Sequence, residues 1–320
     1  IFIGGGTPSL FSADSYARLF HGIQRRLEFA DDIEITLEAN PGSSEAGKFQ
    51  GFRQAGINRL SIGVQSFNPS HLTALGRIHS SNEAVLAAQA AQQAGFSNFN
   101  LDLMFGLPEQ TEAQALADLK QAIALSPTHL SCYQLTIEPN TLFYHAPPVT
   151  PDDEALWSMQ DSLQTELAAN GYNHYEVSAY SLSAKRCRHN LNYWQYGDYL
   201  GIGAGAHAKV TLGDTVQRAW KIKHPATYIT AENKLGDKAW SLVEPNNRPF
   251  EFMMNALRLL EGFSKSQFET RCQLPLTHID ALLEKHAKLG LIEISAEHVK
   301  PTLFGHNMLN TMLEDYLEST

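Results

Sequence analysis

The sequence predicts an α/β protein with a parallel sheet, followed by a smaller helical module. Two observations lead to this prediction. In the first half of the chain, short β-rich runs alternate with amphipathic helical stretches, which is the pattern of βα units. Near the end, helices are followed by two short strands, as in a winged helix. The 320 residues are 43% hydrophobic and 18% charged, which is typical of a globular protein of one or two domains.

Six runs along the first 180 residues have the composition of buried strands. They are residues 1–3, 33–37, 59–64, 99–104, 129–137 and 175–180. Strands that alternate with helices pair in parallel, because each helix returns the chain to the same end of the sheet. An open doubly wound sheet and a closed or partial barrel both fit this order.

The helices between these strands have recognisable beginnings and ends. The first keeps an apolar face from Tyr16 to Leu27, and the last runs from Thr150 to Gly171. Two others begin with a capping box, a Ser or Thr followed three residues later by Glu or Gln. These pairs are Ser80 with Glu83, in a helix that ends at Gly95, and Thr111 with Gln114, in a helix that ends before Pro127.

We expect three parts in the chain. Residues 1–180 form the sheet, residues 181–247 form a connecting segment rich in Tyr, Trp, Gly and His, and residues 248–320 form the C-terminal module. The elements of this module are helices near residues 252–260 and 277–289, strands at 291–294 and 298–300, and a helix that ends near Leu317. Residues 246–320 carry seven basic and ten acidic side chains, a net charge of −3. A DNA-reading wing needs a positive face, so the module is interpreted as structural.

The net charge of the whole chain is −10, from 24 Lys and Arg and 34 Asp and Glu. Such a surface repels phosphate backbones and anionic lipids, which argues against nucleic acid as a partner and leaves at most peripheral membrane contact. No apolar run approaches the roughly 18 residues of a membrane span, and no leader peptide is recognisable. Three widely spaced cysteines argue against a disulfide framework and favour the cytoplasm. A homodimer remains open.

Polar or glycine residues stand at the ends of the predicted strands. Gly4–Thr7 follows the first, Glu38 and Gln65 follow the second and third, and Asp102 lies inside the fourth. In parallel α/β architectures, ligands bind at the carboxyl edge of the sheet. Carboxylates there would hold an ammonium group and ribose hydroxyls, and Arg77 a carboxylate, so we expect an amino-acid-like, ribose-bearing ligand. Taken singly, each residue is more often a cap, a turn residue or a surface group, so the prediction depends on their convergence.

Two other patterns do not support a cofactor site. The first glycine run does not fit the dinucleotide fingerprint G-x-G-x-x-G, because Pro8 follows it directly. Gly201-x-Gly203-x-Gly205 comes closer, but it lacks a convincing following helix and an acidic residue on a second strand. Cys187 and His189 are two residues apart, yet no second pair at zinc-ligand spacing follows. NAD and zinc are therefore not expected.

Several motifs occur in an order that resembles a known family. They are Gly4-Gly5-Gly6-Thr7-Pro8, Glu38-Ala-Asn-Pro, Ser61-Ile-Gly-Val-Gln65-Ser-Phe, Leu75-Gly-Arg77-x-His79 and Asn100-Leu-Asp102-Leu-Met-Phe-Gly-Leu-Pro108. This series resembles the radical S-adenosylmethionine proteins related to oxygen-independent coproporphyrinogen III oxidase. The later segments His189-Asn-x-x-Tyr193-Trp194 and Gly201-Ile-Gly-Ala-Gly-Ala-His207 are most similar to the HemW haem-chaperone branch of that family. The resemblance covers nearly the whole chain.

The resemblance implies a partial (β/α)6 barrel, here without its first βα unit, and a C-terminal helical, winged-helix-like domain. It also implies roles for the residues at the matching positions. Gly5, Gly6 and Thr7 would contact the methionine part of S-adenosylmethionine. The side chains that would complete its binding are Glu38, Gln65, Arg77 and Asp102, with Asp102 a candidate for the ribose.

The family holds a [4Fe–4S] cluster on three cysteines in a C-x3-C-x2-C loop, and this loop is absent from the sequence. Cys132, Cys187 and Cys272 have the wrong spacing to replace it. We therefore expect that the cluster cysteines lie upstream of Ile1, in a segment lost by truncation. No metal ligand is assigned in the fragment, which alone should be inactive.

The resemblance leaves two functions open for the full-length protein. One is a haem chaperone that binds haem and passes it to an unknown acceptor protein. The other is a radical enzyme that oxidatively decarboxylates coproporphyrinogen III to protoporphyrinogen IX. His189 favours haem binding, because an imidazole beside Tyr193 and Trp194 can ligate and enclose a porphyrin, and His207 is the next candidate. The alternative is that His189 is a core histidine bonded to the backbone, with the aromatic residues packing a domain junction.

Overall fold

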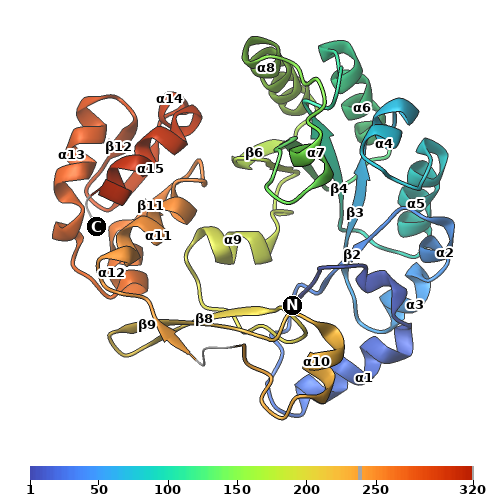
Figure 1. Cartoon of the computed structure of the whole chain (residues 1–320), viewed down its shortest axis with the longest axis horizontal. Helices are drawn as coiled ribbons and strands as arrows, with labels where there is room; N and C mark the ends of the chain where they lie inside the picture. Colours follow the sequence, from blue (N-terminus) through green and yellow to red (C-terminus); the bar gives the residue numbers. More distant parts are fainter. Residues whose placement is uncertain (237–239, 319–320) are drawn as a thin grey trace. The chain divides into compact units, whose positions relative to one another are not determined.

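The structure is a computed structural model, and it describes residues 1–236 and 240–318. The chain divides into two compact units (Figure 1). The first unit consists of residues 1–174 and 178–187, and the second consists of residues 175–177 and 188–320.

A parallel sheet forms the centre of the first unit, as predicted. Its strands follow one another in chain order, as β1 (Phe2–Ile3), β2 (Thr36–Ala39), β3 (Arg59–Gln65), β4 (Phe99–Phe105) and β5 (His129–Gln134). The sequence had indicated a single strand at residues 175–180. The structure instead has β6 (Asn173–Glu176) and β7 (Ala179–Ser181), and β7 pairs with β5 in the antiparallel direction. A turn at residues 177–178 separates the two short strands.

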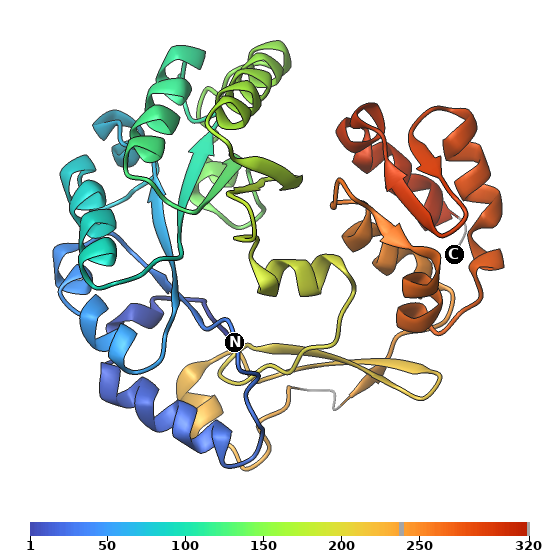
Figure 2. The ribbon, with the colours of Figure 1, turned by 180° about the vertical axis from the view of Figure 1, so that it is seen from behind.

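Helices cover one side of this sheet, as Figures 1 and 2 show from opposite directions. The longer ones are α1 (Ala13–Gln24), α5 (Ser81–Gln93), α6 (Glu112–Ala124) and α8 (Asp153–Ala169). The shorter ones are η1 (Pro8–Leu10), α2 (Ser43–Ala46), α3 (Phe49–Gln54), α4 (Pro69–Ala74) and α7 (Leu142–His145). Both predicted capping boxes are formed, at the first residues of α5 and α6. Helix α8 begins later than the sequence suggested, because the Asp152 side chain accepts the amide hydrogen of Ala155.

The two faces of the sheet differ in chemistry because side chains alternate along each strand. One face is apolar and packs in the main core together with the buried residues of α5, which are all alanines. The fully buried strand residues on this face include Leu37, Leu60, Ile62, Leu101 and Leu130. The residues in alternation with these are mostly polar, and we call them the polar face. They are Thr36, Glu38, Arg59, Ser61, Asn100, Asp102, His129 and Ser131.

The second unit contains two three-stranded sheets. The first sheet is antiparallel and consists of β8 (His207–Leu212), β9 (Thr215–Trp220) and β10 (Ser241–Leu242). Sequence analysis had assigned no strands to this stretch. Helices α9 (Arg188–Trp194) and α10 (Pro225–Thr230) lie before and after the β8–β9 hairpin in the chain.

The C-terminal module has the predicted helical, winged-helix-like composition. Its helices are α11 (Asn247–Ala256), α12 (Lys265–Cys272), η2 (Leu276–His278), α13 (Asp280–Lys288), α14 (Leu303–Asn307) and α15 (Leu309–Glu318). The predicted hairpin of β12 (Ile292–Ile294) and β13 (His298–Pro301) is extended by a strand that the sequence did not reveal, β11 (Phe263–Ser264). The Phe252 ring packs edge-on against those of Phe263 and Phe268 in the core of this unit, at centroid distances of 4.9 and 5.2 Å.

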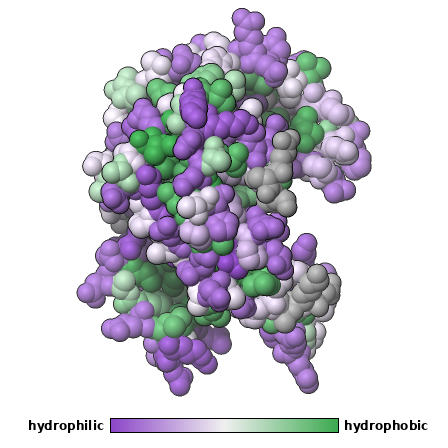
Figure 3. Space-filling model, turned by 90° about the vertical axis from the view of Figure 1, so that its left-hand side faces the viewer, coloured by the Kyte–Doolittle hydropathy of each residue, from purple (hydrophilic) through white to green (hydrophobic). Residues whose placement is uncertain are grey.

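In the view of Figure 3, hydrophobic residues of the described surface form separate patches among hydrophilic ones. Among residues 1–236 and 240–318, every helix is too short or too polar to cross a lipid bilayer. Scattered exposed apolar residues of this kind are usual on protein surfaces.

Candidate functional site

The glycine run after β1 lies against the carboxylate of Glu38. The Glu38 Oε2 atom accepts a hydrogen bond from the Gly5 amide at 3.0 Å. A Cβ atom on Gly4 would lie 2.8 Å from Glu38 Cδ, so only glycine allows this approach. Gly5 has a φ of +82°, which side chains disfavour, and the space around both Gly5 and Gly6 is open. Their backbone is therefore accessible to a ligand.

Asp102 is held by donors from its own strand and from β3. Asn100 Nδ2 donates to Asp102 Oδ1 at 2.8 Å, and Ser61 Oγ donates to Asp102 Oδ2 at 3.2 Å. Ser61 is also the register partner of Glu38 on β2. Behind this pair, the His129 Nδ1 atom lies 2.7 Å from Asn100 Oδ1 and orients the amide that serves Asp102. The carboxylate is fixed before any ligand is bound.

Both acidic side chains of the site are half-buried, and burial raises the pKa of each. For Glu38, the hydrogen bond from Gly5 opposes this rise and the charge of Asp102 adds to it. For Asp102, the bonds from Asn100, Ser131 and Ser61 and the positive charge of Arg59 all lower the pKa again. Two carboxylates whose charges repel each other form an environment that a cationic group would stabilise.

Gln65 and Arg77 belong to the same edge of the sheet. Gln65 ends β3 in a left-handed conformation, with a φ of +68°, and its Oε1 atom accepts a hydrogen bond of 2.6 Å from the Tyr133 hydroxyl. Burial and the charge of Asp102 raise the pKa of Tyr133, whereas the charge of Arg77 lowers it. The Arg77 side chain is exposed after α4, and its effect on Tyr133 indicates that it lies near this group.

The structure thus brings together most of the residues predicted to bind S-adenosylmethionine. Direct bonds or electrostatic effects connect Gly5, Glu38 and Asp102, and Asp102 in turn influences Tyr133, the partner of Gln65. Gly6 and Thr7 continue the glycine loop, and the Thr7 hydroxyl is not used to cap η1. The sequence analysis did not assign a supporting role to Arg59, Asn100, His129, Ser131 or Tyr133. Polar alternation along β4 and β5 was the signal that could have identified them.

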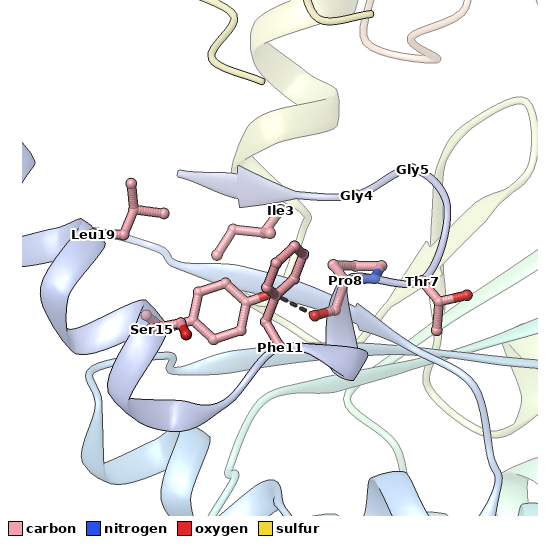
Figure 4. A pocket seen from close by; sticks show the side chains of 9 residues that line it. Ile3, Gly4, Gly5, Thr7, Pro8, Phe11, Ser15 and Leu19 are labelled. Carbon is pink, nitrogen blue, oxygen red and sulfur yellow. Dashed lines mark hydrogen bonds between the residues drawn. The ribbon is translucent and has the colours of Figure 1, made fainter. Parts of the chain in front are cut away.

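A pocket of about 330 Å³ lies on the other side of the glycine loop, between β1, η1 and α1. Figure 4 shows Ile3 and Phe11 facing the same space, with Leu19 and Pro8 at its sides. The Tyr16 hydroxyl closes one wall by donating to the Pro8 carbonyl at 2.5 Å. This pocket is mainly apolar and is not lined by Glu38 or Asp102, but it shares Gly4, Gly5 and Thr7 of the glycine loop with the acidic site.

The two histidines considered for haem binding are both in the second unit. His189 is half-buried on α9, and its ring lies edge-on to Tyr193, with the centroids 4.7 Å apart. Tyr193 in turn contacts the ring of Tyr199 at 4.5 Å. His207 is exposed at the first position of β8, opposite Trp220 in the register. Of the two aromatic residues that the sequence suggested, Tyr193 contacts His189, whereas the Trp194 ring centroid lies 4.2 Å from the Arg258 guanidinium carbon.

The described part of the chain contains no group of side chains that could bind an iron–sulfur cluster. Cys132, Cys187 and Cys272 are all buried. Across residues 1–236 and 240–318, no three His, Cys, Asp or Glu side chains gather in a way that could hold a metal ion. The described residues therefore do not fit a cluster, and no chemistry of this chain is derived from one.

Comparison with known proteins identifies both parts of the chain. Residues 1–122 match the profile of the radical SAM superfamily, and residues 243–305 match the HemN C-terminal domain. The solved structure of coproporphyrinogen III oxidase, HemN, from Escherichia coli has a TM-score of 0.79, covering 98% of this chain and 76% of that one at 21% identity. This similarity shows a shared fold and confirms the predicted radical SAM architecture.

Curated relatives are similar over almost the entire sequence. The proteins named heme chaperone HemW from Haemophilus influenzae and Escherichia coli are each 48% identical over 318 residues, which is 99% of this chain and 82% or 83% of theirs. The protein of that name from Bacillus subtilis is 34% identical over 99% of this chain and 85% of its own length. The chain therefore belongs to the HemW family within the radical SAM superfamily.

Proposed function

We propose that this protein binds haem and delivers it to an acceptor protein. The observation that supports this proposal is the 48% identity, over 99% of the chain, to two proteins that are both named heme chaperone HemW. The structural similarity to coproporphyrinogen III oxidase supports a common fold only, at 21% identity. The carrier function is therefore preferred to the oxidase function.

S-adenosylmethionine is proposed to bind at the acidic edge of the sheet. Glu38 and Asp102 would accept hydrogen bonds from its ammonium group and ribose hydroxyls, and the exposed Arg77 would bind its carboxylate. The open backbone of Gly5 and Gly6 and the hydroxyl of Thr7 complete this set of donors and acceptors. The carboxylates also suit the positive sulfonium, because their mutual repulsion is relieved by a cation.

We infer that a [4Fe–4S] cluster accompanies this cofactor in the working protein, because the matching profile is that of the radical SAM superfamily. The chain's own contribution is to bind and orient the cofactor through the residues described above. We also infer a cytoplasmic location, which the three buried cysteines support.

His189 is the proposed haem ligand, with His207 as the second candidate. An imidazole that is half-buried beside Tyr193 can coordinate iron while the neighbouring aromatic ring contacts the flat porphyrin. His207 is exposed and lacks comparable aromatic contacts on its own strand. His189→Ala should therefore weaken haem binding more than His207→Ala does.

The haem proposal is tested by titrating haem into the whole protein and following the Soret band. His189→Ala should lower the affinity at least tenfold and shift the band, as loss of an axial ligand does. The matched control is His278→Ala, which removes another histidine of the second unit, one whose Nδ1 atom lies 3.2 Å from the Pro275 carbonyl oxygen. If His189→Ala binds haem with unchanged affinity and an unchanged Soret band, His189 is not the ligand.

The cofactor site is tested by calorimetric titration with S-adenosylmethionine. Alanine at Glu38 or Arg77 should weaken binding by about 1.5–3 kcal/mol, the usual range for a hydrogen bond to a charged group. Unaltered affinity in both variants would refute the assignment of this edge.

Carrier and oxidase are distinguished by supplying reductant, S-adenosylmethionine and coproporphyrinogen III to the whole, cluster-loaded protein. Mass spectrometry then detects protoporphyrinogen, and a parallel sample is titrated with haem. Stable haem binding without porphyrin product supports the carrier function. Product formed over many turnovers would contradict it.

A further inference from the structure

Arg59 carries a buried positive charge, and its side-chain Nε atom is unbonded within the described part of the chain. It is the first residue of β3, it is 1% exposed, and it lies on the polar face of the sheet. Its Nε atom is buried and has no acceptor among the described residues. The register partner on β2, Thr36, is fully buried, and its hydroxyl is also unbonded.

A second buried arginine shows what a structural role looks like in the same chain. Arg248 of α11 is 3% exposed, and its guanidinium donates to the carbonyls of Val243, Asp214 and Cys272 at 3.0 to 3.1 Å. Those bonds hold separate segments of the second unit together. Arg59 makes no such bonds, so its burial is not explained by cross-linking of the backbone. An unbonded buried charge is expensive in free energy, and it indicates a different use.

The charge of Arg59 acts on the acidic site. Ser61, which donates to Asp102, is two residues further along the same face of β3. The positive charge of Arg59 lowers the pKa of Asp102 against the effect of burial, and it also lowers the pKa of His129. The charged and titratable groups that act on or near Asp102 are Glu38 of β2, Arg59 of β3, His129, Cys132 and Tyr133 of β5, and Arg77 after α4.

We propose that Arg59 is a positioning residue of the cofactor site, whose fixed positive charge balances the carboxylate of Asp102 from inside the sheet. On strands β1 to β7 of the first unit, no other Lys or Arg side chain is buried. Arg59 thereby favours the charged form of Asp102, the form that a cationic ligand would need. That S-adenosylmethionine is the ligand rests on the function proposed above. The interaction between Arg59 and Asp102 does not depend on it.

The first test needs no ligand. Asp102 is titrated by ¹³C NMR of its carboxyl group in the whole protein, and the resonance is identified by its loss in Asp102→Asn. Arg59→Gln should move the titration midpoint upward by about one pH unit, which corresponds to a tenfold change in proton affinity. Arg59→Lys, which keeps the charge, should restore most of the wild-type midpoint. Arg248→Gln is the matched control, and it should leave the midpoint unchanged.

The second test follows binding of S-adenosylmethionine between pH 5.5 and 8. Arg59→Gln should bind progressively more weakly than the wild type as the pH falls, and the difference should shrink toward pH 8, because the acidic limb of the binding curve moves upward with the Asp102 midpoint. A loss that is equal at all pH values and is not restored by Arg59→Lys would mean a purely structural role and would overturn the proposal. An unchanged titration of Asp102 in Arg59→Gln would overturn it as well.

These outcomes separate the proposal from the proposed function. If the wild-type protein does not bind S-adenosylmethionine but Arg59→Gln still shifts the midpoint of Asp102, the cofactor assignment fails and the charge balance stands. Should Arg59→Gln fail to fold, the double variant Arg59→Gln/Asp102→Asn decides, because it removes both charges together. Restored folding supports the proposal, and continued failure to fold contradicts it.

Discussion

Replacing Gly4 by alanine should displace the Glu38 carboxylate while residue 38 itself remains a glutamate. The added Cβ would lie 2.8 Å from Glu38 Cδ and Oε2 and 2.8 Å from Phe2 Cε1. Contacts this short cannot persist, so the flexible carboxylate must move, and it then loses the bond from the Gly5 amide. A hydrogen bond to a charged group contributes about 1.5–3 kcal/mol. If the ligand depends on Glu38 to the same extent, the affinity for S-adenosylmethionine should fall about 10- to 100-fold.

The measurement is a calorimetric titration of Gly4→Ala, Glu38→Ala and the double variant. Since both single changes remove the same interaction, the double variant should bind no more weakly than Glu38→Ala. Gly22→Ala in α1 is the control, because no atom lies within 4 Å of its new methyl group. That change should leave binding unaltered and stabilise the helix by about 0.5–1 kcal/mol. Wild-type affinity in Gly4→Ala, or fully additive losses in the double variant, would refute the steric reasoning.

Three further predictions concern pH, a helix cap and the second core. The folded-state pKa of Glu38 is raised, so its contribution to stability is present below about pH 4 and is lost as the pH rises through the folded value. Glu38→Gln should flatten this pH dependence in urea titrations, and an unchanged slope would contradict the assignment. Ser80→Ala removes the cap of α5 and should cost about 1 kcal/mol, whereas an unchanged urea midpoint would exclude a role for the capping box. Phe252→Ala should cost about 3–5 kcal/mol, and a loss below 1 kcal/mol would show that the aromatic cluster repacks.

Local signals allowed much of the first unit to be predicted from the sequence. The boxes at Ser80 and Thr111 form as expected, because capping depends on residues only three positions apart. Strand ends were predicted to within a few residues: Gly4 follows β1 and Gln65 ends β3, whereas β2 continues past Glu38 to Ala39 and β5 ends before residue 137. Parallel strands then bring such residues to one edge, so part of the site followed from topology alone.

Features that depend on contacts between distant segments were not predictable. The run at residues 175–180 has strand composition throughout, yet it breaks at residues 177–178 and β7 pairs antiparallel to β5. Composition contains no information on pairing direction. The network of Asp102 was missed for the same reason, because its bond from Ser61 depends on how β3 and β4 align. The left-handed conformation of Gln65 likewise has no signature in the sequence.

The polar face of the sheet shows how stability and binding oppose each other in this fold. Its apolar counterpart places Leu37, Leu60 and Leu101 under the helices, where burial of each stabilises the protein by about 1.5–3 kcal/mol. The same strands carry two carboxylates with raised pKa and an unbonded guanidinium, all of which are costly to bury. Apolar side chains in these places would fold at least as well, but they could not bind a charged ligand. Asn100 and Ser61 already donate hydrogen bonds to Asp102, so its carboxylate is ordered before a ligand binds. Binding then needs little further free energy to order this side chain, and more of the ligand's interaction energy contributes to affinity.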